Sequence, residues 1–139
     1  MAEFKIPTET VDLPSKGLLY PKDSPLAEGK IELKYMTAKE EDILTNQNYI
    51  RQGTVIDKLL QSLIVTKINY NDLLVGDKNA IMVASRILSY GANYNFNYDG
   101  VEQEIDLSSI ENKPLSKEVE QTESNNFTFT LPHSENVVT

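Results

Sequence analysis

The chain has 139 residues, 40% of them hydrophobic, which suits one domain or one small domain with an appendage. It contains no cysteine, which excludes disulfides, thiolate metal sites and cysteine nucleophiles. The formal net charge of -8 is uneven, since residues 99–139 hold nine acidic and two basic side chains. An acidic segment of this kind repels nucleic acid and anionic membranes.

The apolar residues are too scattered for a membrane protein. No run approaches the roughly 20 apolar residues that span a bilayer. The N-terminus lacks the basic and then apolar regions of a secretory signal. The sequence therefore predicts a soluble protein made in the cytoplasm.

Residues 1–30 are interrupted by prolines and glycines, which prevent long regular elements. Apolar residues are nevertheless frequent, unlike in a disordered leader. We expect an extended arm with turns, docked on its own domain or on a neighbour. The candidate contact residues for a partner are Leu13, Pro14, Leu18, Leu19, Tyr20 and Pro21.

A strand and a capped helix follow the arm. Apolar and polar residues alternate over residues 31–35, which predicts a short, half-buried strand. Thr37 and Glu40 have the spacing of a capping box, in which each side chain accepts a hydrogen bond from the other residue's amide. This predicts a helix over residues 37–52, ended by Gly53.

Two further helices are indicated. Thr54 is the expected N-cap of the second, and Asp77 is the expected N-cap of the third, which ends at Gly91. The second has a core-facing stripe with a period near 3.6. Its members are Val55, Ile56, Leu59, Leu60, Leu63 and Ile64.

Beyond the helices the period changes to two. The pair Asp99-Gly100 is typical of a type I′ turn, so residues 93–107 predict a β-hairpin. Its alternating aromatic residues Tyr94, Phe96 and Tyr98 are interpreted as a packed sheet face, and Ile105 as pointing inward. A polar spacer over residues 116–126 and a strand near Phe127 complete the pattern.

The predicted fold is α+β, with a small three-helix unit and a short strand. An extended Pro-rich arm covers residues 1–30 and a helical core with its leading strand covers residues 31–92. A β-rich, acidic C-terminal region with the hairpin covers residues 93–139.

Motifs for chemistry are weak. Gly76 and Lys78 begin like a phosphate loop, but the motif's earlier glycine is missing, Lys78 is followed by Asn79 instead of serine or threonine, and Asp77 would repel phosphate. His133 is the only histidine and is expected in an exposed loop. The carboxylates of residues 40–42 are explained by capping and the helix dipole. We therefore expect no enzyme activity, no cofactor and no metal site, and a role in protein–protein interaction.

Two parts of the sequence resemble the baseplate hub proteins of T-even-type contractile-tailed bacteriophages. The first is LPSKGLLYP with SPLAEGKIELKYMTAKEEDIL, and the second is LLVGDKNAIMVASRILSYGANY. The resemblance covers about residues 11–107. It implies a structural or assembly protein of the central hub, with other hub and tail proteins as partners and an oligomer within the hub. Assembly in the host cytoplasm and a place in the virion baseplate follow from it.

The sequence also departs from that family. Relatives carry a Cys-x-x-Cys-like element near the hairpin, and its absence means that no metal site is carried over. Relatives also extend beyond LPHSENVVT, so we expect a truncated or short form.

Three other functions remain open from the sequence. One is an assembly chaperone absent from the mature virion, which mass spectrometry of virions would distinguish. Another is a hub-associated cell-wall hydrolase that uses Glu40 and Glu41, which muralytic assays of glutamine variants would test. The third is a protein that binds a host component, which pull-downs would reveal.

Overall fold

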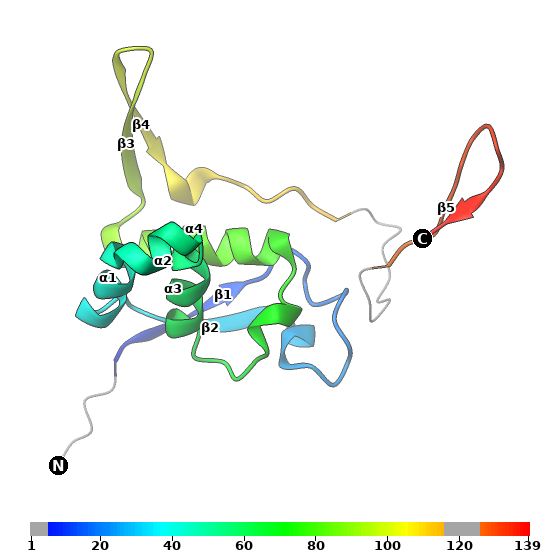
Figure 1. Cartoon of the computed structure of the whole chain (residues 1–139), viewed down its shortest axis with the longest axis horizontal. Coiled ribbons are helices and arrows are strands. Elements are labelled where there is room, and N and C mark those ends of the chain that lie inside the picture. Colours follow the sequence, from blue (N-terminus) through cyan, green and yellow to red (C-terminus); the bar gives the residue numbers. More distant parts are fainter. Residues whose placement is uncertain (1–5, 116–125) are drawn as a thin grey trace.

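The computed structural model describes residues 6–115 and 126–139, and its mixture of helices and strands confirms the α+β class (Figure 1). The described part has four α-helices rather than the three predicted. The elements are β1 (Thr8–Asp12), β2 (Lys30–Lys34), α1 (Ala38–Thr45), α2 (Gln47–Gln52), α3 (Val55–Leu63), α4 (Val75–Tyr90), β3 (Asn93–Tyr98), β4 (Val101–Asp106), β5 (Phe129–Thr130) and β6 (Val137–Val138).

The N-terminal arm contributes a strand that no sequence pattern predicted. Strand β1 pairs antiparallel with the predicted strand β2, so that Thr8 lies opposite Lys34 and Asp12 opposite Lys30. The other edge of β2 receives residues 64–66, since the amide of Val65 donates to the carbonyl of Glu32 at 2.9 Å. Strand β2 is therefore covered on both edges, and its side chains Ile31 and Leu33 are buried.

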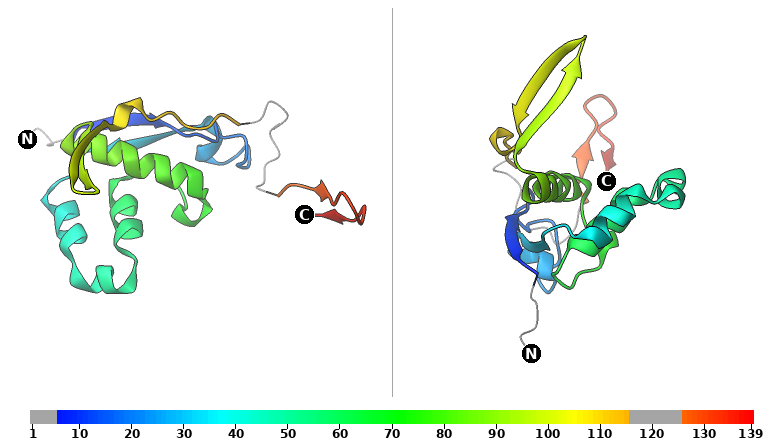
Figure 2. Two further views of the ribbon diagram at one scale, coloured as in Figure 1. Left: turned by 90° about the horizontal axis from the view of Figure 1, so that it is seen from above. Right: turned by 90° about the vertical axis from the view of Figure 1, so that its left-hand side faces the viewer.

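The core lies between this ribbon and helices α3 and α4. Seen along α4, the β1–β2 ribbon is on one side of the helix and the β3–β4 hairpin extends away on the other (Figure 2). Burial of an aliphatic side chain contributes roughly 1.5–3 kcal/mol, so this cluster supplies much of the stability. Its buried members are Leu13, Tyr20, Leu26, Ile31, Leu33, Leu60, Leu73 and Ile81.

The loop that joins β1 to β2 is closed by two glycines. Gly17 and Gly29 both have positive φ, at 76° and 71°. A Cβ on Gly17 would lie 2.2 Å from the carbonyl oxygen of Ala27, and one on Gly29 would lie 2.7 Å from the carbonyl carbon of Lys16. The backbone segments pack directly on each other, which only glycine permits.

The helix predicted over residues 37–52 is interrupted at Asn46. That residue adopts an extended conformation, with φ of -70° and ψ of 110°, and its side chain accepts hydrogen bonds from the amides of Asn48 and Tyr49. Asparagine is a strong N-cap residue, so it starts a second helix, α2, instead of continuing α1. The predicted end at Gly53 is confirmed, since Gly53 is the left-handed C-cap of α2.

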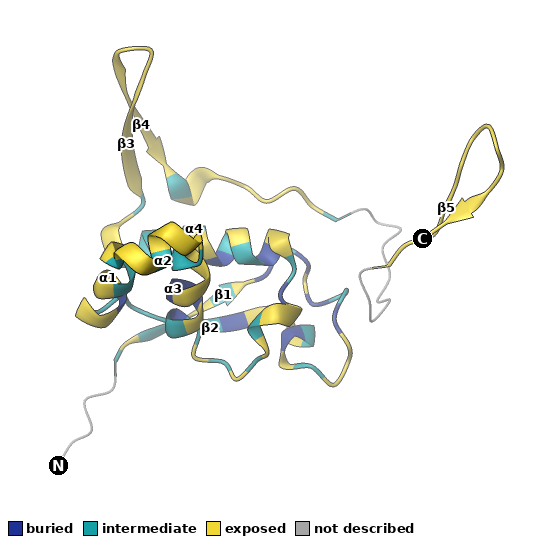
Figure 3. Ribbon diagram, viewed as in Figure 1, coloured by how far each residue is buried: buried dark blue, intermediate teal, exposed yellow. Residues whose placement is uncertain are grey.

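The predicted hairpin is confirmed, whereas the predicted packing of its aromatic face is wrong. Asp99 and Gly100 both have positive φ, as a type I′ turn requires. Every residue of β3 and β4 is exposed, and Figure 3 shows the hairpin standing clear of the core. Ile105, predicted to point inward, is 37% exposed. The alternation of apolar and polar residues therefore indicates an amphipathic strand pair, and no other element in the described residues covers its apolar side.

The predicted polar spacer lies almost wholly outside the described residues. After it, β5 and β6 pair with each other, with Phe129 opposite Val138 and Thr130 opposite Val137. Both strands are short and exposed.

Candidate protein-interaction surface

Two residues of the predicted contact arm belong to the core of this chain. Leu13 and Tyr20 are 3% and 2% exposed, so neither is available to a partner in this conformation. The other four predicted contact residues have more accessible side chains: Pro14, Leu18 and Leu19 are partly exposed and Pro21 is exposed. The arm is thus held on its own domain, and only part of its predicted surface remains open.

Asp77 holds the arm in place, and its predicted role as an N-cap is wrong. Helix α4 begins two residues earlier, with Leu74 at the N-cap position, so Asp77 lies inside the first turn. Its carboxylate is buried and accepts hydrogen bonds from the Ser15 amide at 3.1 Å and the Ser15 hydroxyl at 2.7 Å. The Tyr20 hydroxyl donates to it at 2.5 Å. An N-cap side chain accepts hydrogen bonds from amides of its own helix, whereas the Asp77 carboxylate accepts them from the distant arm.

The Tyr20 hydroxyl links the arm to α4 a second time. It accepts a hydrogen bond from the Leu74 amide at 3.1 Å, one of the amides that the helix itself leaves unpaired. Burial, followed by the hydrogen bond to Asp77, raises the pKa of Tyr20 well above its usual value. The hydroxyl therefore remains protonated and continues to donate.

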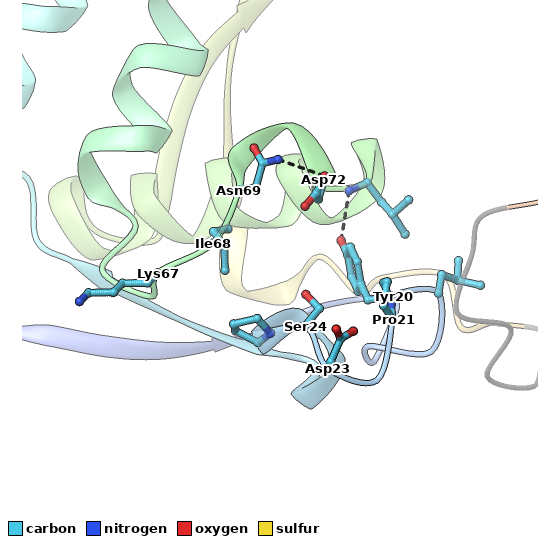
Figure 4. A pocket seen from close by; sticks show the side chains of 11 residues that line it. Tyr20, Pro21, Asp23, Ser24, Lys67, Ile68, Asn69 and Asp72 are labelled. Carbon is cyan, nitrogen blue, oxygen red and sulfur yellow. Dashed lines mark hydrogen bonds between the residues drawn. The ribbon is translucent and has the colours of Figure 1, made fainter.

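A groove of about 910 Å³ runs between the arm and the loop before α4 (Figure 4). Leu19, Pro21 and Ile68 are among its apolar lining residues, and Asp23, Lys67 and Asp72 are its charged ones. The Asn69 amide donates to Asp72 at 3.3 Å, within the groove wall. The groove is lined by both apolar and charged side chains.

Glu40 is a structural carboxylate. It is fully buried and forms an ion pair with Lys34 of β2 at 2.6 Å, and it accepts from the Ser62 hydroxyl of α3 at 2.5 Å. The amide of Thr37 donates to it at 3.0 Å, which confirms its half of the capping box. Burial alone would raise the pKa of Glu40, but these hydrogen bonds outweigh it and lower the pKa to about 2.

The burial of Glu40 bears on the hydrolase alternative. The neighbouring Glu41 is exposed, so the two carboxylates do not face one common cleft. Two catalytic carboxylates must both reach the scissile bond. This pair therefore lacks the arrangement that glycoside hydrolysis needs.

The remaining predicted sites are local. Thr37 and Thr54 occupy N-cap positions as predicted. The Thr37 hydroxyl donates a hydrogen bond to Glu40 at 2.5 Å, and the Thr54 hydroxyl is buried without a hydrogen-bond partner. His133 lies in an exposed turn, as predicted. In the described ranges, 6–115 and 126–139, no group of three or more histidine, aspartate or glutamate side chains is placed to hold a metal ion.

The β3–β4 hairpin presents two different faces. Residues opposite each other in the register share a face, so Tyr94 lies beside Ile105 and Tyr98 beside Val101. We call this side the apolar face, and its members are Tyr94, Phe96, Tyr98, Val101, Gln103 and Ile105. The other side, the acidic face, consists of Asn93, Asn95, Asn97, Glu102, Glu104 and Asp106.

The apolar face continues onto the end of α4. Tyr94 and Phe96 stack with ring centroids 6.0 Å apart. The Arg86 guanidinium lies 5.1 Å from the Tyr90 ring centre and 5.8 Å from that of Tyr94, and it donates to the Gly91 carbonyl at 3.0 Å. Tyr90 is itself exposed, so an aromatic surface extends from the helix end along the hairpin. Single exposed apolar residues are ordinary, but contiguous ones mark interaction sites.

Comparison with known proteins agrees with an interaction role. The family model described as T4 bacteriophage base plate protein matches residues 6–139. No curated protein and no solved structure matches the chain. Because the matched region includes nearly the whole chain, arm, core and hairpin together, this protein belongs to the family of T4 bacteriophage base plate proteins.

Proposed function

We propose that this chain is a structural subunit of the central hub of the phage baseplate, which acts through contacts with other hub and tail proteins. Membership of the baseplate family supports a structural role and a location in the virion tail. The observation that carries the contact role is the exposed hairpin with its uncovered apolar face. Contiguous exposed apolar surface of this kind marks an interaction site, and a protein surface is the cover that fits here.

The same features support a non-enzymatic role. Glu40, the most deeply buried of the three adjacent carboxylates at residues 40–42, holds β2, α1 and α3 together. The strongly acidic hairpin disfavours nucleic acid and anionic membranes as partners. No helix among the described residues has the length and apolar character needed to cross a bilayer. Proteins therefore remain as the partner class, including further copies of this chain within the hub.

Quantitative mass spectrometry of purified virions and of isolated baseplates tests the proposal. A hub subunit is expected at a fixed stoichiometric ratio to the other tail proteins in both samples. A phage that lacks this chain should fail to complete baseplates in the host cytoplasm. Complete baseplates without the chain would contradict the structural role, and presence in intermediates but absence from virions would indicate an assembly chaperone instead.

A further inference from the structure

We propose that the β3–β4 hairpin inserts into a cleft on a different baseplate protein, one with an apolar floor and with lysine or arginine side chains on its rim. This inference rests on the proposed function, because it assigns the surface through which the subunit is held. It depends on three features of the hairpin, namely its uncovered apolar face, its one-sided charge and its hydrogen-bonded base at the end of α4.

The apolar face identifies the floor of the cleft. Tyr98 is 72% exposed, Val101 is 57% exposed, and Tyr94 and Phe96 are also accessible to solvent. Aromatic side chains carry large contact area with few rotatable bonds and dominate the binding energy of many interfaces. Arg86 of α4 contacts the Tyr94 ring at the base of the hairpin, but Phe96, Tyr98 and Val101 stay open to solvent in the described structure, so an external apolar surface is the complement.

The charge on the hairpin identifies the rim. Between Arg86 and Lys113 the chain has five acidic side chains and no basic one. Glu102 and Glu104 both lie on the acidic face, opposite the face that becomes buried. When the apolar face enters a cleft, these carboxylates are brought to its edge, where basic side chains attract them.

The same charges argue against a second copy of this chain as the occupant. Two hairpins that paired edge to edge through β4 would bring two sets of carboxylates close together, and two that met through their apolar faces would leave both acidic faces without a basic counterpart. Like charges across an interface oppose association, and this segment has no lysine or arginine to offset them. Opposite charge on the partner removes the repulsion, so a different protein is the favoured occupant.

The hairpin is fixed at its base before it binds. The Leu107 amide donates to the Ala92 carbonyl at 2.8 Å, and the Asp106 carboxylate accepts from the Ser108 amide at 2.9 Å. Arg86 adds its hydrogen bond to Gly91 and its contact with the Tyr94 ring. A segment that is already ordered loses less conformational entropy on binding, which favours a projecting hairpin as the docking element.

Competitive incorporation tests the role of the apolar face. Cells infected with a phage that lacks the chain supply equal amounts of tagged wild type and of the variant Phe96→Thr/Tyr98→Thr. Purified baseplates are then analysed for the ratio of the two. Loss of two central aromatic anchors is expected to lower incorporation by about 30-fold or more. Threonine keeps the strand propensity, so the hairpin itself should persist.

The matched control carries the same substitution on the other face. Asn95→Thr/Asn97→Thr changes the same strand at neighbouring positions and should be incorporated in a ratio near one. Both variants should unfold thermally at the wild-type midpoint, because neither face contributes to the core. Equal incorporation of the two variants would overturn the docking inference while the chain's presence in the baseplate still supported the proposed function.

Site-specific photo-cross-linking identifies the occupant directly. A benzophenone amino acid replaces Phe96 in one sample and Asn95 in another, and purified baseplates are irradiated and analysed by mass spectrometry. Position 96 is expected to link to one other baseplate protein, within a segment bordered by lysine or arginine. Links to a second copy of this chain, or an acidic partner segment, would overturn the proposal. Absence of wild-type chain from the baseplates would overturn both the docking inference and the proposed function.

A charge variant tests the rim. When purified chain is mixed with purified baseplate proteins, Glu102→Gln/Glu104→Gln should be incorporated less than wild type at low salt, and the difference should diminish at high salt, because screening weakens charge attraction. The control Glu28→Gln/Glu41→Gln removes the same charge from exposed positions outside the hairpin and should be incorporated like wild type. An equal effect of the two pairs would show that net charge, and not the hairpin, is recognised.

Discussion

The Tyr20 hydroxyl lies 2.5 Å from a carboxylate oxygen of Asp77, although 57 positions separate the two residues in the chain. With Ser15, this contact joins the LPSKGLLYP segment to the first turn of α4. These are the two strings that suggested the baseplate family. Their proximity in the structure gives a physical reason for both, since one supplies the buried acceptor and the other supplies its donors.

Removal of the Asp77 carboxylate should destabilise the domain strongly. Asp77→Ala leaves the Ser15 amide, the Ser15 hydroxyl and the Tyr20 hydroxyl without their acceptor, so we expect the free energy of unfolding to fall by about 3 kcal/mol. Tyr20→Phe should cost about 1–2 kcal/mol. Urea unfolding measures both, and the double variant should lose less than the sum because the two residues share one network. Strict additivity would contradict the coupling, and exposed Asp42→Asn is the control.

The free energy of unfolding should decrease as pH falls, because Glu40 becomes protonated. Its pKa is lowered from 4.5 to about 2 in the folded state, so the unfolded state binds the proton first as pH falls. The stabilisation is complete above about pH 4.5 and is lost as pH falls toward 2. At the 1.36 kcal/mol that each pKa unit represents, it amounts to at most about 3 kcal/mol.

Denaturant titrations between pH 2 and pH 7 check this dependence. Glu40→Gln should be less stable than wild type at pH 7, and its stability should change less between pH 4.5 and pH 2. Glu41→Gln, at the exposed neighbour, should retain the wild-type profile. If Glu40→Gln and wild type lost stability in parallel over this range, titration of the Glu40 carboxylate would not be the cause.

Two glycines with the same backbone conformation should respond differently to alanine. Gly17 and Gly53 both have positive φ, but a Cβ on Gly17 would meet the Ala27 carbonyl oxygen at 2.2 Å, whereas one on Gly53 would meet nothing within 4 Å. Gly53→Ala should cost about 1 kcal/mol, the ordinary penalty of a left-handed residue. Gly17→Ala should cost clearly more, because backbone must also move. Thermal unfolding compares them, and equal losses would contradict the close packing of the arm.

Gly76→Ala should leave the domain as stable or make it more so. Gly76 lies in the first turn of α4, and a Cβ there would meet nothing within 4 Å. Alanine restricts the unfolded chain and favours the helix, so a gain of about 0.5 kcal/mol is expected. A loss in urea unfolding would indicate that the glycine is needed for the turn into α4.

Local signals predicted most of the helices, because each depends on residues close in the chain. The Thr37 and Glu40 spacing placed the start of α1, and Gly53 placed the end of α2. The break between α1 and α2 could have been predicted from the sequence, since Asn46 is a strong N-cap residue in a segment with a weak apolar stripe. The start of α4 was misplaced because Asp77 is equally suited to cap a helix and to accept donors from elsewhere.

By itself, the sequence determined the α+β class, the helices around α3 and α4, the type I′ hairpin and the resemblance to baseplate proteins. Only the tertiary structure decided which apolar residues are covered. Tyr20 and Tyr98 are both tyrosines in irregular or extended segments, yet one is buried against Leu74 and Asp77 and the other is exposed to solvent. A repeat of two or 3.6 residues identifies the side of an element that is apolar, whereas burial depends on a second element that the chain brings opposite it. The ribbon β1–β2 has helices α3 and α4 opposite it, and the hairpin β3–β4 has none in the described chain.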